Sequence, residues 1–471
     1  MTVTTINPAT GEPLASYEET SAEALDAILD RARAAARVWR LTPPPERGQA
    51  LVRLAERLRA KRDELALLAT LEMGKPLAES HAEVEKCAWT CEWFAEHGPA
   101  LLEPDQADTE AVSSSVAYAP LGVLFAIMPW NFPYWQVVRA LAPALAAGNV
   151  VVLKHAPSTT GCALKLGEIA DEAGLPAGVF SVIVAGVEST PAISERVITD
   201  DRVAAVTLTG SSRAGRSVAA IAGGALKKTV LELGGSDPFV VLANADTEAA
   251  ASWAVLSRFQ NTGQSCIATK RIIVEEAVAD EFTERLLAHV AELRLGDPTE
   301  PHVTIGPVAR EDLRDLVARQ VSESVEQGAR VLTGGSAPDR AGFYYQPTVL
   351  DRVPAGAPVL TEEVFGPAVP LVRAADDEDA IRLANDTSYG LGSNLWTSDL
   401  AHGHELALRL DAGHTAVNGI TISDPRLPFG GVKDSGYGRE LSSFGIHEFV
   451  NVHTVVVNEP TGPVTNQPAV E

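Results

Sequence analysis

Cysteine is scarce in this sequence, and its spacing matches no disulfide framework. The four cysteines in 471 residues are Cys87, Cys91, Cys162 and Cys266. This pattern is not that of a small secreted protein held together by disulfides. Cys87 and Cys91 lie four residues apart in a stretch of helical character, but no further His or Cys ligands stand close by. We therefore expect these two side chains to pack in the protein and expect no metal site.

Long apolar runs are also missing. The most apolar run, residues 121–129, is much too short to cross a bilayer. The first ten residues have neither the basic start nor the apolar segment of a secretory signal peptide. We therefore expect a soluble, cytoplasmic protein.

Basic residues are outnumbered, with 38 Lys and Arg against 62 Asp and Glu, which gives a net charge of −24. Such a charge disfavours nucleic acid or an anionic membrane surface as a partner and is typical of a soluble protein. Hydrophobic residues make up 46% of the chain, as in ordinary globular proteins. A chain of this length is too long for one core, so at least two domains are expected.

The first hundred residues are mainly helical in pattern. Thr20 followed by Glu23 matches a capping box. Apolar residues then recur at helical spacing at Leu25, Ile28, Leu29, Ala32 and Ala36. Residues 43–45 are all proline and end this helix. A second amphipathic helix is predicted after them from Leu51, Leu54, Leu58 and Leu65.

From about residue 121, short β-rich runs alternate with helical ones. The predicted strands are Val123–Ile127, Val150–Leu153, Phe180–Val184, Ala205–Thr209 and Val230–Leu233, with helices near 160–173, 190–198 and 213–222. A second series begins with Phe239–Leu242 and Arg271–Val274 and continues to about residue 420. Apolar strands separated by helices indicate parallel sheets covered on both faces. The fold class is α/β, with two doubly wound units meeting near residue 234. The tail after Val457 is expected to be mobile.

Two short polar segments contain side chains that could act in catalysis. Asn261–Cys266 sets a thiol after a small polar turn, and Leu231–Ser236 contains the carboxylate of Glu232. A thiol and a carboxylate are the minimum for covalent catalysis in which one group attacks and the other activates water. A single intracellular cysteine is otherwise more often an inert, buried apolar residue.

Three positions at strand ends are candidates for binding. Thr209–Gly215 follows a predicted strand and opens a helix, which favours an anion, although it lacks the G-x-G-x-x-G and P-loop patterns and a plain turn fits equally well. Lys154 ends another strand and could reach a ribose or phosphate, or remain a solvated charge. Asn131, held between prolines in Met128–Pro133, is either an oxyanion donor or a turn residue bonded to its own backbone.

Six motifs in order give the chain a resemblance to the aldehyde dehydrogenase superfamily over about residues 6–456. They are Pro129–Pro133, Leu208–Ser211, Leu231–Gly235, Gly263–Cys266, Glu362–Pro367 and Pro428–Lys433. Within that superfamily, Met128–Gln136, Lys154–Pro157, Leu231–Asp237 and Ser435–Glu440 look most like the bacterial succinate-semialdehyde dehydrogenases.

The resemblance implies a role for individual residues. Cys266 matches the nucleophile, Glu232 the general base and Asn131 the oxyanion donor. Positions that match contacts to NAD or NADP are Trp130, Lys154, Pro157, Gly210, Ser211, Leu233, Glu363 and Phe365. Candidate substrate residues are Arg139, Arg426 and Phe429, and no metal is implied. Arg139 matches an arginine that grips the substrate carboxylate in the succinate-semialdehyde branch, because Arg pairs with carboxylates in two parallel hydrogen bonds.

The resemblance also implies two Rossmann-like α/β domains and a β oligomerisation arm. A dinucleotide-binding domain is expected over residues 1–107 and 123–233, a catalytic domain over 234–434, the arm over 108–122 and 448–458, and a flexible tail over 459–471. The arm suggests a homodimer or homotetramer. The expected reaction is NAD(P)-dependent oxidation of succinate semialdehyde to succinate, with a small aldehyde as the only partner.

Two positions depart from the family pattern. Gln260 stands six residues before the nucleophile, where some branch members carry a second arginine. Glutarate semialdehyde or a neutral aldehyde therefore remains an alternative substrate, with Arg258 or Arg426 as a possible substitute for the missing cation. Pro157 stands where NAD-selective members often carry Glu, so we expect NADP to be tolerated. A thiol esterase, a non-catalytic relative and an acyl-CoA-forming enzyme are the other function classes.

Overall fold

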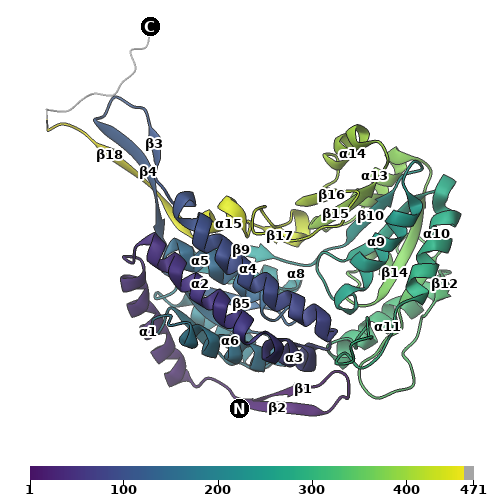
Figure 1. Ribbon diagram of the computed structural model, residues 1–471, viewed down its shortest axis with the longest axis horizontal. Coiled ribbons are helices and arrows are strands. Elements are labelled where there is room, and N and C mark those ends of the chain that lie inside the picture. Colours follow the sequence, from purple (N-terminus) through teal and green to yellow (C-terminus); the bar gives the residue numbers. More distant parts are fainter. Residues whose placement is uncertain (461–471) are drawn as a thin grey trace, which may run out of the picture.

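Two mostly parallel sheets, each covered by helices, form two lobes in the computed structural model, which describes residues 1–460 (Figure 1). The first lobe contains a six-stranded sheet and the second a seven-stranded sheet. Both carry a single antiparallel strand at an edge. This arrangement confirms the predicted α/β class with two doubly wound units.

The first sheet has the strand order β17-β9-β8-β5-β6-β7. Its strands in chain order are β5 (Val123–Met128), β6 (Val150–His155), β7 (Phe180–Ile183), β8 (Ala205–Thr209), β9 (Lys228–Glu232) and β17 (Gly436–Tyr437). The chain adds β6 and β7 on one side of β5, then returns to add β8 and β9 on the other side. The connections that follow β5 and β8 therefore run to opposite sides of the sheet. Open α/β sheets bind ligands at the carboxyl ends of two such neighbouring strands.

The second sheet has the strand order β12-β13-β14-β11-β10-β15-β16. Its strands are β10 (Asp237–Val241), β11 (Thr269–Glu275), β12 (Arg330–Thr333), β13 (Thr348–Asp351), β14 (Ala368–Ala374), β15 (Gly392–Trp396) and β16 (His414–Val417). β9 ends at residue 232 and β10 begins at residue 237, so the chain passes from the first sheet to the second between these residues.

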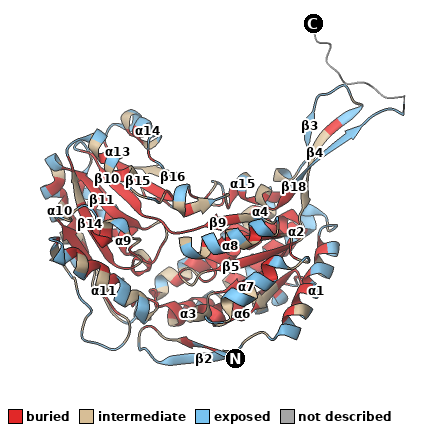
Figure 2. Cartoon of the chain, turned by 180° about the vertical axis from the view of Figure 1, so that it is seen from behind, coloured by how far each residue is buried: buried red, intermediate tan, exposed pale blue. Residues whose placement is uncertain are grey.

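Helices cover both faces of both sheets, with their apolar sides inward. Those of the first lobe are α1 (Ala22–Trp39), α2 (Pro44–Ala60), α3 (Arg62–Met73), α4 (Leu77–Leu101), α5 (Trp135–Ala147), α6 (Thr160–Glu172), α7 (Thr190–Thr199), α8 (Ser212–Gly224) and α15 (Ser442–Glu448). Those of the second lobe are α9 (Thr247–Phe259), α10 (Glu276–Ala291), α11 (Glu311–Glu326), α12 (Pro358–Thr361), α13 (Asp377–Asn385) and α14 (Leu400–Ala407). Figure 2 shows the strands buried and the outer helix faces exposed. None of the helices within residues 1–460 combines the length and apolar character needed to span a bilayer.

The start of α1 differs from the predicted capping box. Ser21 is the N-cap, because its hydroxyl accepts a hydrogen bond from the backbone N–H of Ala24 at 3.2 Å. Thr20 instead joins α1 to the end of β7, since its hydroxyl accepts from the N–H of Val184 at 2.9 Å. That contact also explains why β7 ends at Ile183, one residue earlier than predicted.

Two further local predictions are corrected. The helix predicted over Leu51–Leu65 is divided at Lys61 into α2 and α3. The N-terminus forms a hairpin of β1 (Thr2–Ile6) and β2 (Pro13–Glu18), which the largely helical prediction for the first hundred residues did not include.

A three-stranded antiparallel sheet projects away from the first lobe (Figure 1). It contains β3 (Asp105–Ala107), β4 (Ser113–Pro120) and β18 (Val450–Val457). We call this sheet the arm. Its strands overlap the segments 108–122 and 448–458, and the bounds and the oligomerising role of the arm stay a prediction. Most of the segment predicted as a flexible tail, 459–471, lies outside the described residues.

Candidate active site

A cleft lies at the carboxyl edge of the first sheet, between the loops that follow β5 and β8. Its volume is about 500 Å³. The predicted site residues on its wall are Trp130, Asn131, Gly210, Ser211, Leu233, Cys266, Glu363 and Phe365. Trp130 and Phe365 meet edge to face, with ring centroids 5.6 Å apart. We call this cavity the dinucleotide cleft, because its position is where α/β sheets bind such ligands.

The residues of the cleft fit a dinucleotide. Ser211 caps α8 by accepting from the N–H of Ala214 at 3.3 Å, so the positive end of a helix faces the cleft. Arg213, the second residue of that helix, also lies on the wall of the cleft. α8 approaches the sheet closely because residue 215 is glycine: a Cβ there would lie 2.5 Å from a methyl carbon of Leu233. These features suit a ligand with a pyrophosphate.

Two predicted cofactor positions lie away from that wall. Lys154 is buried in β6, and this burial lowers the pKa of its amine to about 8. Pro157 begins a short 3-10 helix, η1 (Pro157–Thr159), after the same strand. Both stand at the correct edge of the sheet, and their contact with a cofactor stays a prediction.

Cys266 lies in the loop between η2 (Gln260–Gly263) and β11. The loop is unusual because Asn261 and Thr262 both have left-handed backbone angles, with φ of 53° and 55°. The Asn261 side-chain amide donates to the carbonyl oxygens of Asn131 at 2.9 Å and Gln264 at 3.1 Å. These bonds fix the cysteine loop of the second lobe against the Asn131 loop of the first.

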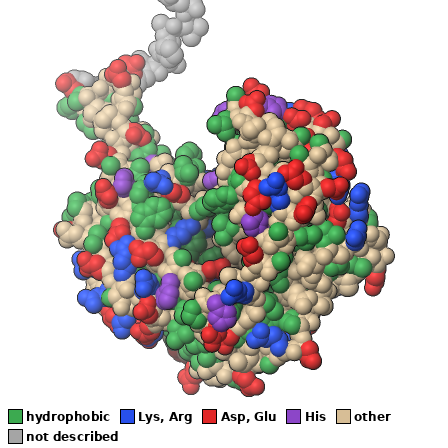
Figure 3. Space-filling model, turned by 45° about the vertical axis from the view of Figure 1, so that its right-hand side comes forward, with side chains coloured by type: hydrophobic (Ala, Val, Ile, Leu, Met, Phe, Trp, Pro, Cys, Tyr) green, Lys and Arg blue, Asp and Glu red, His purple; other side chains and the backbone are tan. Residues whose placement is uncertain are grey.

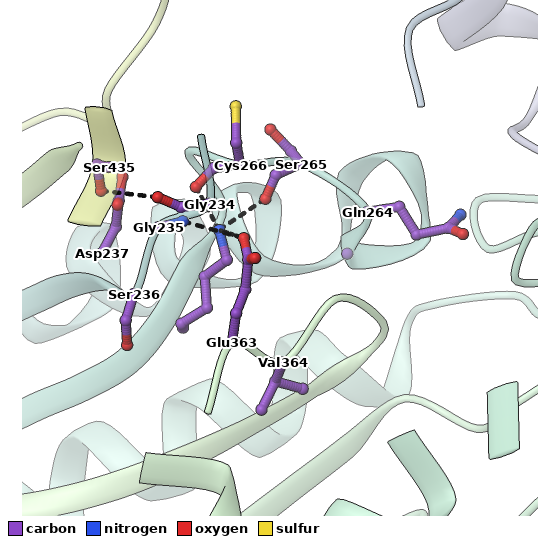
Figure 4. A network of polar contacts seen from close by, with 12 residues as sticks. Gly234, Gly235, Ser236, Asp237, Gln264, Ser265, Cys266, Glu363, Val364 and Ser435 are labelled. Atoms are coloured by element: carbon purple, nitrogen blue, oxygen red, sulfur yellow. Dashed lines mark hydrogen bonds and ion pairs between the residues drawn. The ribbon is translucent and has the colours of Figure 1, made fainter. Parts of the chain in front are cut away.

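Lys270 holds the other side of the cysteine loop. Its buried amine donates to the carbonyl oxygens of Ser265, at 2.7 Å, and Cys266. Glu363 lies 4.0 Å from the same amine and accepts from the N–H of Gly235 at 3.0 Å. Figure 4 shows the sulfur of Cys266 directed away from this network. The backbone at Cys266 is therefore fixed by hydrogen bonds, and its thiol takes no part in the contacts that hold the cysteine loop.

The Cys266 thiol lies on the walls of two cavities. One is the dinucleotide cleft, and the other is a cavity of about 430 Å³ that we call the substrate cavity. Burial raises the pKa of the thiol to about 11, while the charges of Arg139 and Lys270 act in the opposite direction. Among the four cysteines it is the only one that is not fully buried. A reactive thiol between two cavities can attack a ligand in one while a second ligand occupies the other.

Asn131 lies on the wall of the same cleft as Cys266 and is 3% exposed. Its side-chain nitrogen donates to the carbonyl oxygen of Gln264 at 3.0 Å. An amide nitrogen carries two hydrogens, so one remains for a ligand oxygen. The geometry is compatible with the predicted oxyanion donor.

Glu232 ends β9 and is 2% exposed. Neither of its carboxyl oxygens has a hydrogen-bond partner in the described part of the chain. Burial and the nearby Glu440 raise the pKa of this carboxyl well above its usual range, against the charges of Arg139 and Arg439. Glu232 lies outside the walls of both cavities, so a role as base requires water or side-chain movement to link it to the thiol.

The substrate cavity contains two of the three predicted substrate residues, Arg139 and Phe429. Arg139 is buried, forms an ion pair with Glu440 and stacks over Phe429, 4.5 Å from the ring centroid. Arg426 is not on the wall. Its side chain is 66% exposed and donates to both oxygens of Asp424, at 2.8 and 2.6 Å. Its prediction as a substrate residue is therefore wrong.

Arg258 does not replace the missing cation either. Its guanidinium is fully buried and donates to the carbonyl oxygens of Thr269, Gly263 and Val364 at 2.9, 3.2 and 3.1 Å. These contacts tie α9 to the cysteine loop. The sequence placed Arg258 close to the site, but only the fold shows that it points into the protein.

Several cavity residues were missed because they come from elements without a motif. The missed residues include Glu79, Lys86, Trp253 and Ser423, and the wall also contains Gln260 and Gln136, which the sequence had pointed to. Glu79, Glu83 and Lys86 recur at helical spacing on α4, and this polar stripe was the only sequence signal for that wall. Within residues 1–460, no group of three or more His, Cys, Asp or Glu side chains is arranged to hold a metal ion.

A thiol between a dinucleotide cleft and a second cavity defines an enzyme that pairs covalent catalysis with a nicotinamide cofactor. The family model described as "Aldehyde dehydrogenase family" matches residues 1–455. This chain belongs to the aldehyde dehydrogenase family.

The most similar relatives compared span nearly the whole chain. A succinate semialdehyde dehydrogenase [NAD(P)+] of Escherichia coli K12 is 47% identical, with 96% of both chains covered. A succinate-semialdehyde dehydrogenase [NADP(+)] of Mycobacterium tuberculosis H37Rv is also 47% identical, over 97% of this chain and 99% of the relative. A crystal structure of the Streptococcus pyogenes succinic semialdehyde dehydrogenase with NADP+ has a TM-score of 0.94 at 35% identity, and covers 97% of this chain and 100% of the other.

The raised pKa of Cys266 predicts slow alkylation near neutral pH. With a pKa of about 11, the rate of iodoacetamide alkylation at Cys266 should rise about tenfold per pH unit between about pH 7 and pH 9, because only the thiolate reacts. Peptide mass spectrometry of the cofactor-free protein measures this rate, and the buried Cys162 serves as an internal control. A rate that stays flat over this range would contradict the account.

Proposed function

We propose that this protein oxidises succinate semialdehyde to succinate with NADP or NAD. The observation that carries the proposal is the position of Cys266 on the walls of both cavities. The 47% identity to two succinate-semialdehyde dehydrogenases over nearly the full chain supports the choice of aldehyde.

In the first step the Cys266 thiolate adds to the aldehyde carbon and forms a thiohemiacetal. The negative oxygen is stabilised by the free N–H of the Asn131 amide and by the backbone N–H of Cys266. Such a donor is worth about 3–4 kcal/mol where it operates. A nicotinamide cofactor held by the residues of the dinucleotide cleft would supply the hydride acceptor for this oxidation. Cys266 then holds the acyl group as a thioester.

In the second step the Glu232 carboxylate, linked to the thioester by water or by movement of its side chain, takes a proton from a water molecule, which attacks the thioester and releases the acid. A carboxyl whose pKa is raised by burial is a better base, once deprotonated, than an exposed one. The released thiol is ready for another aldehyde. Arg139 lies close enough to Cys266 and Glu232 to lower the pKa of both, so it stabilises their charged forms.

The arm supports a proposal about assembly. Along β18, the side chains of Val452, Val455, Val456 and Val457 are all exposed, an apolar strand that a second copy of the chain can cover. We place the protein in the cytoplasm as a homodimer or homotetramer built through this arm.

The proposal predicts a preference for an acidic aldehyde. Succinate semialdehyde should have a kcat/KM at least about tenfold higher than butanal, which has the same length but no carboxylate. NAD(P)H formation with both aldehydes and with glutarate semialdehyde measures this. Equal or better turnover of butanal would reject the proposal in favour of a neutral aldehyde, and highest turnover of glutarate semialdehyde would favour that alternative. Ester hydrolysis without cofactor, in the absence of any oxidation, would indicate an esterase.

Pro157 predicts that NADP is accepted. A glutamate at this position would repel the 2′-phosphate of NADP, and proline has no charge there. We expect kcat/KM values for NADP and NAD within about a hundredfold of each other, or roughly 3 kcal/mol. The variant Pro157→Glu is the matched control and should lose activity with NADP much more than with NAD. A wild-type preference for NAD above that limit would contradict the prediction.

A further inference from the structure

Lys270 is a buried lysine whose amine contacts the peptide group that joins Ser265 to Cys266. It lies in β11, and none of its surface is exposed. The ammonium donates to the carbonyl oxygen of Ser265 at 2.7 Å and to that of Cys266. The Ser265 oxygen also accepts from the N–H of Ala268 at 3.2 Å. The carbonyl of this peptide group is therefore held by two donors, one of which is charged.

The same peptide group carries the backbone N–H of Cys266 at its other end. The peptide bond is trans, so this N–H points in the direction opposite to the Ser265 carbonyl oxygen. Within residues 1–460 the Cys266 N–H donates to no acceptor. Figure 4 shows the Cys266 sulfur on the side of the loop opposite to Glu363. By fixing the carbonyl oxygen, Lys270 therefore also fixes the direction of a free N–H on the far side of the peptide.

Two carboxylates hold the Lys270 amine against these carbonyl oxygens. Glu363, on the loop before β14, lies 4.0 Å from the amine, and the charge of Asp237, at the start of β10, also acts on it. Burial lowers the pKa of Lys270, while the two carboxylates act in the opposite direction and favour the ammonium form. The packing is close as well, because a Cβ on Gly235 would lie 2.6 Å from the Cys266 carbonyl oxygen.

We propose that Lys270 is a positioning residue for the oxyanion site, which orients and polarises the Ser265–Cys266 peptide group so that the N–H of Cys266 binds the thiohemiacetal oxygen. This role rests on the proposed function, in which that N–H is one of two oxyanion donors. As the bond from sulfur to the aldehyde carbon forms, an electron pair of the C=O double bond moves onto the oxygen, and negative charge develops there.

The physical basis of the role is the coupling between the two ends of one peptide group. A charged donor at the carbonyl oxygen draws electron density towards that oxygen, which makes the N–H of the same group a stronger donor. A donor that is already oriented also needs no reorganisation when the negative charge appears. Lys270 thus acts on the reacting oxygen through the peptide, without touching the substrate.

The test compares two reactions of Cys266 in one variant. Lys270→Met removes the ammonium and keeps the length of the side chain. Oxidation of an aldehyde, measured as kcat/KM at saturating NADP, and iodoacetamide alkylation of the cofactor-free protein both need the thiolate, but only oxidation develops an oxyanion. At one pH we expect kcat/KM to fall about tenfold more than the alkylation rate. The factor should be the same for succinate semialdehyde and butanal, because both form the oxyanion.

Three further variants calibrate this comparison. Asn131→Ala removes the other oxyanion donor and should show the same pattern more strongly, with kcat/KM falling about a hundredfold more than alkylation. Thr262→Val is the matched control, since it removes a hydrogen bond of about 3.2 Å between the cysteine loop and Gly306 at nearly constant volume. It leaves the Ser265–Cys266 peptide untouched and should change both rates by the same factor. Lys270→Arg returns the charge and should recover most of the lost kcat/KM.

Equal losses of both reactions in Lys270→Met would show that Lys270 acts only on the thiol or on the shape of the loop, and would overturn the proposed role. Unchanged kcat/KM would overturn it too. If Lys270→Met does not fold, Lys270→Gln keeps a polar end group in the buried space and should lose about threefold in kcat/KM relative to alkylation; no difference there is equally contradictory. Wild-type activity tests the proposed function separately. An enzyme that oxidises butanal but not succinate semialdehyde would lose its proposed substrate, while butanal still measures the effect of Lys270.

Discussion

The site depends on the hydrogen bonds of Asn261 between the two lobes. Its side-chain amide binds the carbonyl oxygens of Asn131 and Gln264, and so fixes Asn131, the proposed oxyanion donor of one lobe, against the cysteine loop of the other. Cys266 and Asn131 come from sequence segments more than a hundred residues apart, and without this link their separation would vary with any movement between the lobes. The left-handed angles of Asn261 and Thr262 are tolerated because these bonds, and Arg258 beneath them, hold the loop. Figure 3 shows the molecule hollowed between the lobes, with hydrophobic side chains around the hollow.

The buried cations around this hollow differ in what they contact. Lys270 and Arg258 are buried and donate hydrogen bonds to backbone carbonyl oxygens, so they hold the cysteine loop in place. Arg139 is paired with Glu440, and its charge favours the ionised forms of Cys266 and Glu232. Lys86, also on the wall of the substrate cavity, has no carboxylate partner in the described chain, and its amine donates to the Ser423 hydroxyl.

Sequence patterns predicted the two lobes and most of the dinucleotide cleft, because strand ends and small-residue loops are local signals. They also placed Cys266, Asn131 and Arg139 near each other through motifs. They failed for Arg426, since nothing in the chain order shows that Asp424 binds its guanidinium and turns it to solvent. They missed Lys86 because α4 has no motif, and its approach to Ser423 depends on packing between segments 337 residues apart. Whether a charged side chain faces a cavity or the protein interior is a property of tertiary packing, which single-sequence patterns do not contain.

The central claim is that Cys266 carries the acyl group and Glu232 releases it. The most direct measurement is the intact mass of Glu232→Gln after mixing with succinate semialdehyde and NADP, followed by peptide mapping. The account predicts a burst of NADPH and a succinyl group on the Cys266 peptide, with no adduct and no burst in a folded Cys266→Ala variant. Undiminished steady-state turnover by Glu232→Gln without any adduct, or NADPH production by Cys266→Ala, would contradict it.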